Sequence, residues 1–189
     1  VVSLDPKNLG EILDGIEQVG RATGTEDQAT DVVASLRDRI EAVRRQAERL
    51  PAIRTFCLEW LEPPYVGGHW IPEMVAIAAG ENLLNEPEKR SRTVTWREIG
   101  DASPEVVVFM PCGYYLAEAE DEAVRIYEVP EFRATTAYSE RSVFAVDATS
   151  FFSRPGPRIV DGLEVLAWAI HPDTFPEPPA STITRVRPA

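Results

Sequence analysis

Val106-Val-Val-Phe-Met-Pro-Cys-Gly113 is a short apolar run that ends abruptly in proline, cysteine and glycine. Five consecutive apolar residues between turn-forming residues predict a buried β-strand, Val106–Met110. Comparable runs at Ile53–Leu58 and Val143–Val146, and a shorter one near Leu83, alternate with segments of helical period. These segments are Pro72–Ala79, Trp96–Asp101, Leu116–Tyr127 and Pro157–Ile170. The alternation predicts an α/β fold, a three-layer α/β/α sandwich with a mainly parallel sheet.

Two helices are predicted before this region. The first spans Leu9 to Val19 and closes at Gly24. The second follows a capping-box pattern at Thr25–Gln28 and carries a narrow apolar stripe as far as Leu50, before Pro51 stops it. A rigid strut along a domain edge explains so narrow a stripe, and a coiled-coil dimer is the structural alternative.

These elements divide the chain into three parts. Residues 1–51 hold an N-terminal strand at Val1–Leu4, the first helix and a long backbone helix. Residues 52–172 form the α/β lobe, and residues 173–189 form a Pro-rich tail that we expect to be loose.

Composition limits the possible partners. The formal net charge of −12 disfavours nucleic acid, which needs clustered Lys and Arg. No apolar run approaches the roughly 20 residues of a membrane-spanning helix. Two cysteines, Cys57 and Cys112, are too few for a disulfide framework or a Cys-based zinc site, and no metal site is predicted.

The loops that follow the strands are rich in aromatic residues. Ligands of open parallel sheets bind at the carboxyl ends of the strands, so these loops form the expected ligand edge. Their aromatic residues are Trp60, Tyr65, Trp70, Tyr114, Tyr115, Phe151 and Phe152. Together with Gly67, Gly68, Gly113 and Gly156, they predict a broad apolar platform that a large ligand approaches closely. We expect two or three of the rings to serve only as core.

Three polar side chains lie in the same loops. Arg154 is positioned to hydrogen-bond a ligand or to form a salt bridge. His69 could bind a metal or a ligand, or simply hydrogen-bond a loop. Cys112, with His69 and Glu59, offers the parts of a thiol enzyme, although the chain contains none of the common catalytic motifs.

These loops resemble a known family. Cys57-Leu-Glu-Trp-Leu-Glu-Pro-Pro-Tyr-Val-Gly-Gly-His-Trp-Ile-Pro-Glu-Met74, Gly80-Glu-Asn-Leu-Leu84, Met110-Pro-Cys-Gly113 and Phe152-Ser-Arg-Pro-Gly-Pro-Arg158 are similar to the cobalamin-binding branch of the periplasmic binding proteins served by ABC importers. Related members bind ferric siderophores and haem.

The resemblance implies an extracytoplasmic, non-catalytic receptor of two lobes joined by a long backbone helix. This chain would hold that helix and the C-terminal lobe, with the N-terminal lobe outside it. Cobalamin is the implied ligand, with no catalytic cofactor, and a ferric siderophore or haem is the alternative. Tyr65 and Phe151 match positions that flank the corrin, Arg154 matches an arginine near the ligand, and Trp60, His69 and Trp70 lie in the motif.

Docking to the transporter permease is also implied by the resemblance. Family members place an acidic residue in the segment corresponding to Val94–Glu98, commonly where Arg97 stands here. Glu98 is adjacent and is the candidate docking residue. Thr95–Glu98 is also a capping-box pattern, which would occupy the Glu98 carboxylate at a helix start.

Overall fold

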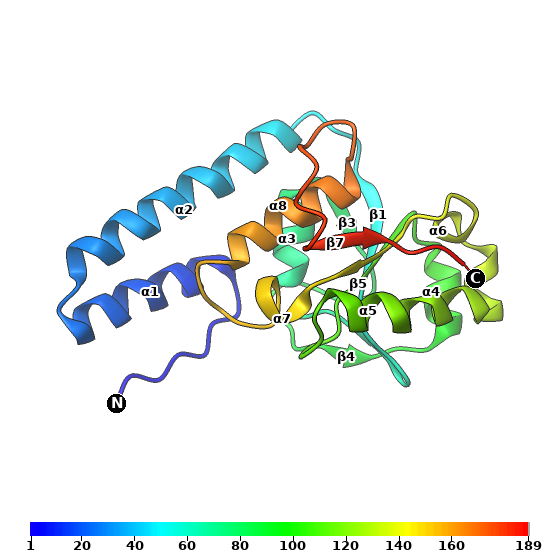
Figure 1. The fold of residues 1–189 in the computed structure, drawn as a ribbon, viewed down its shortest axis with the longest axis horizontal. Coiled ribbons are helices and arrows are strands. Elements are labelled where there is room, and N and C mark those ends of the chain that lie inside the picture. The colour runs from blue at the N-terminus through cyan, green and yellow to red at the C-terminus, as the bar shows by residue number, and fades with distance from the viewer. Residues whose placement is uncertain (189) are drawn as a thin grey trace.

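A seven-stranded sheet forms the centre of the molecule in the computed structural model, which describes residues 1–188 (Figure 1). The strands are β1 Ile53–Leu61, β2 Pro64–Val66, β3 Gly80–Asn82, β4 Arg92–Thr93, β5 Val106–Phe109, β6 Val143–Val146 and β7 Ile183–Arg185. Their order is β4-β2-β1-β5-β6-β7, and β3 also pairs with β1. β1, β3, β5 and β6 are parallel, whereas β2, β4 and β7 pair antiparallel. The predicted mainly parallel sheet is confirmed.

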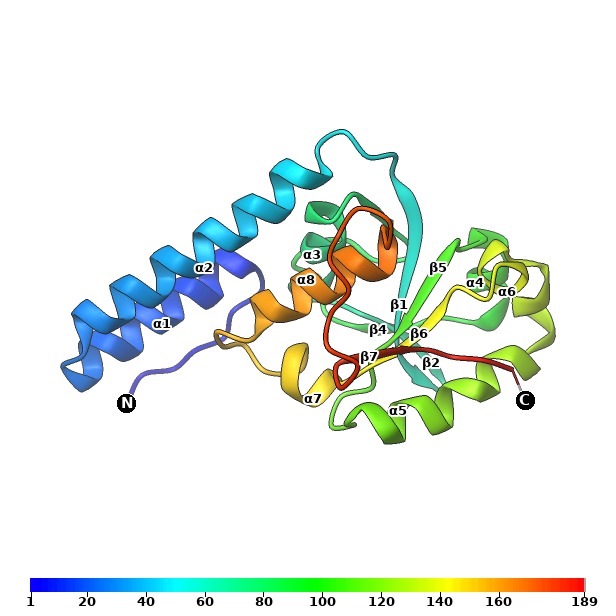
Figure 2. The same cartoon turned by 45° about the horizontal axis from the view of Figure 1, so that its top comes forward.

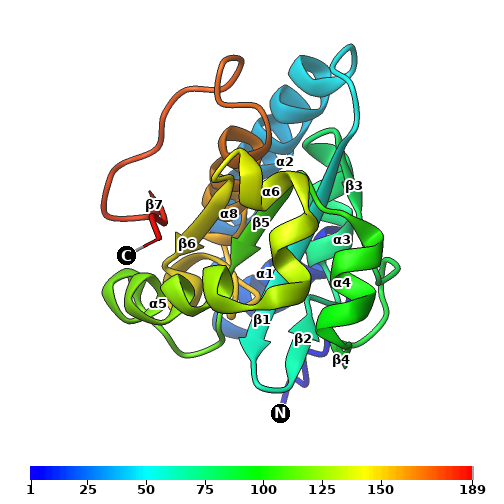
Figure 3. The same ribbon diagram turned by 90° about the vertical axis from the view of Figure 1, so that its right-hand side faces the viewer.

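Helices cover both faces of the sheet (Figure 3). They are α1 Leu9–Thr23, α2 Glu26–Ala47, α3 Ile71–Ile77, α4 Trp96–Ala102, α5 Leu116–Ala123, the 3₁₀ helices η1 Val124–Glu128 and η2 Pro130–Ala134, α6 Thr136–Ser139, α7 Ala148–Phe151 and α8 Ile159–Ile170. Because side chains alternate along a strand, Cys57 and Val108 join the core under α2, α3 and α8, while Phe56 and Val107 join the core on the opposite face. The three-layer prediction is therefore confirmed.

Helices α1 and α2 form an antiparallel hairpin that projects from the lobe (Figure 1). The predicted stripe of α2 from Ala29 to Ala47 is buried, and α2 packs on α1 and α8. The stripe is thus covered within one chain. The capping box predicted at Thr25 is wrong, because this side chain caps no helix N–H and lies 2.8 Å from the Thr23 hydroxyl.

The two ends of the chain also differ from the prediction. Val1–Leu4 is exposed and belongs to no strand, and its Leu4 side chain lies beside Gly15 of α1 instead. The C-terminal segment is not loose. Phe175 and Val186 are buried, and β7 extends the sheet beside β6, where the Val186 N–H donates to the Val143 carbonyl at 2.8 Å (Figure 3).

Candidate functional site

The carboxyl ends of β1, β5 and β6 meet at one edge of the sheet (Figure 2). Leu58 pairs with Phe109, and Phe109 pairs with Ala145, so the segments that leave these strands start side by side. The segment after Leu58 is not the open loop that we predicted. β1 continues to Leu61 and turns back as β2, which holds its aromatic residues on a hairpin.

Three predicted aromatic residues lie together at this edge. Trp60 on β1 is the register partner of Tyr65 on β2, and its ring meets Tyr114 edge to face, with centroids 5.6 Å apart. The Tyr114 carbonyl accepts the Thr149 N–H at 3.0 Å, so the segment after β6 is tied to the segment after β5. The Tyr114 hydroxyl hydrogen-bonds the Glu122 carboxylate, which raises the tyrosine pKa. Edge-to-face pairs of this kind form a firm apolar surface.

A second group joins the segments after β2 and β6. The Trp70 indole N–H donates to the Phe152 carbonyl at 3.1 Å, and the His69 ring lies 5.7 Å from the Trp70 ring. His69 has a φ of 55°, and its N–H donates to the Lys89 carbonyl at 2.6 Å. The backbone of His69 therefore holds the loop at Lys89 in place.

The remaining predicted residues differ widely in exposure. Phe152 is buried in the core, as expected for some of these rings, and Phe151 is half-buried against the same core. Tyr115 is 55% exposed at the start of α5. Arg154 is exposed, and it forms no ion pair with any other residue in 1–188.

The glycines of the hairpin loop serve internal packing instead of ligand approach. A Cβ on Gly68 would lie 2.6 Å from the Lys89 carbonyl oxygen, because the backbone of residues 89–91 fills that space. A Cβ on Gly67 would crowd Ile71. Gly113 has a φ of 92°, which requires glycine, and no atom lies within 4 Å of its missing Cβ.

The proposed thiol enzyme is not assembled. Glu59 is hydrogen-bonded to the Ser91 hydroxyl and the Gly68 N–H, and its burial raises its pKa. Among residues 1–188, no hydrogen bond links Cys112 to His69, and no group of three His, Cys, Asp or Glu side chains is placed to hold a metal ion. Cys57 is buried, which raises its pKa.

The structure also reveals a basic cavity that was not predicted from the sequence. It has a volume of about 560 Å³ and is lined by Leu84, Asn85, Glu86, Lys89, Arg90 and Arg92. The run Lys89-Arg90-Ser91-Arg92 is the sequence signal that could have indicated it.

The hydroxyl of Thr149, in α7, is buried without a hydrogen-bond partner among the described residues.

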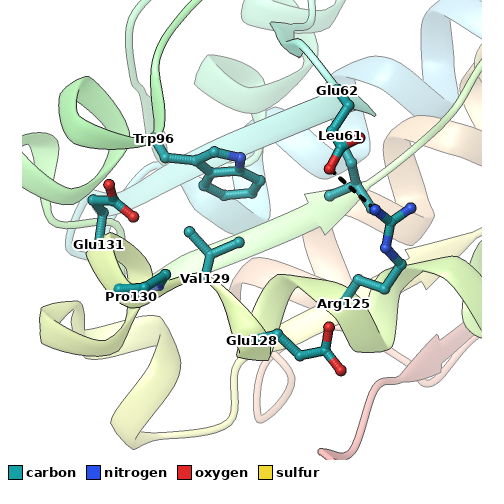
Figure 4. Close-up of a pocket in the computed structure, with 8 residues that line it drawn as sticks. All are labelled: Leu61, Glu62, Trp96, Arg125, Glu128, Val129, Pro130 and Glu131. Carbon is teal, nitrogen blue, oxygen red and sulfur yellow. Dashed lines mark hydrogen bonds and ion pairs between the residues drawn. The ribbon is translucent and has the colours of Figure 1, made fainter.

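A further cavity of about 310 Å³ lies where the β1–β2 hairpin meets α4 and η1 (Figure 4). Trp96 and Val129 form its apolar wall, and Arg125 pairs with Glu62 at 3.1 Å across it.

On the same helix as Trp96, the capping box at Thr95 and Glu98 is confirmed. The Thr95 N–H donates to the Glu98 carboxylate at 2.7 Å, which lowers the pKa of Glu98.

The fold is that of a solute-binding domain. The family model for periplasmic binding proteins matches residues 1–149, so the chain belongs to the periplasmic binding protein family. Its members bind and deliver solutes without catalysis.

Two curated relatives agree with this assignment. The chain is 24% identical, over 92% of its length, to an uncharacterized ABC transporter substrate-binding lipoprotein, YvrC, of Bacillus subtilis. It is 28% identical, over 86% of its length, to a cobalamin-binding protein of Halobacterium salinarum. These alignments cover 54% and 46% of the relatives, so the chain spans about half the length of the curated relatives it matches.

Solved structures share the fold. A periplasmic binding protein of Veillonella parvula aligns with a TM-score of 0.77 and 20% identity over 89% of this chain and 58% of that one. The periplasmic vitamin B12 binding protein of Vibrio cholerae gives 0.71 and 22% over 89% and 64%. A periplasmic heme-binding protein of Roseiflexus gives 0.74 and 21% over 89% and 65%. Within residues 1–188, no helix is long and apolar enough to cross a membrane.

Proposed function

We propose that this chain is one ligand-holding lobe of a cobalamin-binding protein that serves an ABC importer. The observation that carries the proposal is the pairing of Trp60 with Tyr114 beside Tyr65 at the carboxyl edge of the sheet. Flat aromatic surfaces suit a corrin, which is large and largely apolar around its rim. The relative from Halobacterium salinarum, whose name describes cobalamin binding, supports the same ligand.

In this proposal the other predicted residues surround that aromatic surface. Tyr115 and Arg154 are exposed, and Arg154 is available to hydrogen-bond amide groups on the rim of the ligand. His69, Trp70, Cys112, Gly113, Phe151 and Phe152 belong to the segments that position it. The lobe works outside the cytoplasm, and a second lobe closes the ligand from the other side.

Transporter docking is assigned to the surface around Glu98. Its carboxylate is exposed although it caps α4, and Arg97 beside it is turned toward Asp101 at 3.9 Å. In the hairpin cavity beside Trp96 on the same helix, Glu62 is paired with Arg125, and Glu128 and Glu131 supply further negative charge (Figure 4). Such a surface complements basic side chains on a permease.

A second candidate ligand is an anionic ferric siderophore or haem. The specific observation in its favour is the basic cavity lined by Lys89, Arg90 and Arg92, since anionic chelates are held by clustered cations. The heme-binding structural neighbour from Roseiflexus fits this alternative. Mutagenesis can distinguish the two candidate ligands, because different residues line the basic cavity and the Trp60–Tyr114 surface.

Calorimetric titration with cyanocobalamin, haemin and a ferric hydroxamate tests the proposal. We expect cobalamin to bind and Trp60→Ala to weaken it about tenfold, because one ring of the paired surface is lost, equivalent to ~1.4 kcal/mol. Trp96→Ala is the matched control, because Trp96 lines the hairpin cavity instead of the Trp60–Tyr114 surface, and it should leave the affinity for cobalamin unchanged. The same titration on the full reading frame that contains this chain measures the contribution of a second lobe.

Two results would count against the assignment. Binding of haemin or the hydroxamate alone, lost in Arg90→Ala, would establish the second candidate. If the full reading frame and the chain both leave cyanocobalamin unbound, cobalamin is the wrong ligand.

A further inference from the structure

A separate cavity of about 540 Å³ lies between α2, α8 and the C-terminal segment. Figure 1 shows α8 running beside α2, with the segment after α8 descending toward β7. Its volume is within the range of small-molecule sites, roughly 300–1,000 Å³. Val43 on α2, Val165 on α8, and Phe151 and Phe175 supply apolar walls from separate parts of the chain.

The walls of this cavity are fixed without a ligand. Arg39 on α2 donates to Glu164 and Asp161 on α8, each at 2.6 Å, which sets the distance between the two helices. The Gln46 side-chain amide donates to the Thr174 carbonyl at 2.6 Å, and Phe175 is buried. The cavity is therefore preformed, which lowers the entropic cost of binding.

The charges at its rim select the ligand. Asp161, Glu164 and Glu177 carry three negative charges against the single positive charge of Arg39. Arg39 already pairs through Nε and Nη2 with both carboxylates on α8, so its positive charge is compensated within the protein. Its pKa is raised by these bonds, and it stays protonated. The uncompensated charge at the rim is negative, which favours a cation, while the Phe151 and Phe175 rings suit an apolar body.

We propose that this cavity is a second binding site, which takes a small organic cation with an apolar body and one ammonium group. The body fills the space between Val43, Val165 and the two phenylalanines, and the ammonium group lies at the rim near Glu177. Phe151 is the one lining residue that the cobalamin proposal also uses; the rest of this cavity lies between α2, α8 and the C-terminal segment, and it is assayed with different ligands.

Three probes of one shape test the charge preference. 4-tert-Butylbenzylammonium, 4-tert-butylbenzyl alcohol and 4-tert-butylbenzoate are titrated into the chain by calorimetry at neutral pH and low salt. We expect the ammonium compound to bind about tenfold more tightly than the alcohol, and the benzoate to bind least. Added salt should weaken only the ammonium compound, because the rim charges are partly exposed.

Variants locate the binding. Ala42→Trp, on the exposed side of α2 at the cavity, should abolish binding, while Ala34→Trp, exposed on the same helix but outside the cavity, should not change it. Glu177→Gln should lower affinity for the ammonium compound and leave the alcohol unaffected. The proposal is overturned if no probe binds, if the benzoate binds as well as the ammonium compound, or if Ala42→Trp binds normally while remaining folded by circular dichroism.

Discussion

Arg39 on α2 holds Glu164 on α8 through two parallel hydrogen bonds, from Nε to Oε1 at 2.9 Å and from Nη2 to Oε2 at 2.6 Å. The same Nη2 also donates to Asp161. A planar guanidinium matches a carboxylate in this way, and an ammonium cannot. The pairing fixes the long helix to the lobe through side chains that are far apart in the sequence.

Arg39→Lys should therefore lower the free energy of unfolding by about 1 kcal/mol, the upper end for a partly exposed pair. Arg37→Lys is the matched control, because Arg37 is more exposed and lies 3.8 Å from Glu17, and we expect no measurable change. Urea unfolding followed by circular dichroism measures both. Equal effects for the two variants would contradict a specific role of Arg39.

Gly68→Ala should destabilise the chain by about 1–3 kcal/mol, because the added methyl group overlaps the backbone of residues 89–91. Gly156→Ala, in a loop with open space around its Cβ position, should be neutral or slightly stabilising. Thermal unfolding distinguishes the two. A neutral Gly68→Ala would mean that the loop from Lys89 to Ser91 does not pack where the structure places it.

Glu59 should make stability depend on pH. Burial raises its pKa, so the folded chain holds this proton more firmly than the unfolded chain, whose pKa is about 4.3. The unfolding free energy of the natural chain should fall, relative to Glu59→Gln, as pH rises from about 4 through the folded pKa. Ser91→Ala removes a hydrogen bond that lowers this pKa, so the fall in unfolding free energy should continue to a higher pH. Urea titrations between pH 4 and 8 measure the difference, and a difference that does not vary with pH would refute it.

The two thiols should react in different states of the protein. Cys112 is exposed, whereas Cys57 is buried. Burial and the nearby negative charge of Glu59 both raise the pKa of Cys57. A chromogenic disulfide reagent should modify one thiol per native chain, at Cys112, and the second only after unfolding. Mass spectrometry of the labelled peptides identifies the site. Modification of Cys57 in the native protein would show that this part of the core opens.

Much of the fold followed from local pattern. Val106–Met110 and Val143–Val146 are apolar on both faces, as parallel strands between two helical layers must be, so they were recognised without tertiary information. The stripe of α2 follows from the helical spacing of its apolar residues, which is also a local pattern. Its partner, α1, was predicted as a helix, but pairing of the two depends on tertiary contacts that a pattern does not contain.

The predictions from sequence that differ from the structure also have physical explanations. The sequence predicts a loop after Leu58 where the structure has the β1–β2 hairpin; Pro63 and Pro64 at its turn conceal the hairpin, because proline is uncommon inside strands. Thr25 matched a capping box, but the side chain bonds Thr23 instead. Within the candidate site, Trp60, Tyr65 and Tyr114 lie at the predicted edge of the sheet. Their partners, such as Trp60 with Tyr114, required the register of β1 and β5.

The prolines of the C-terminal segment predict a loose tail, whereas the structure has the strand β7 there. Ile183 is 6% exposed and pairs with Val146 at the edge of the sheet. Ile183→Ala should lower the free energy of unfolding by about 2–4 kcal/mol, because it leaves a cavity under β7. Arg187→Ala, exposed just beyond the strand, should cost less than about 0.5 kcal/mol. Urea unfolding compares the two, and a loose segment would give the same small cost for both. Hydrogen exchange adds a second measurement, because the Val186 N–H is protected only if it donates to Val143.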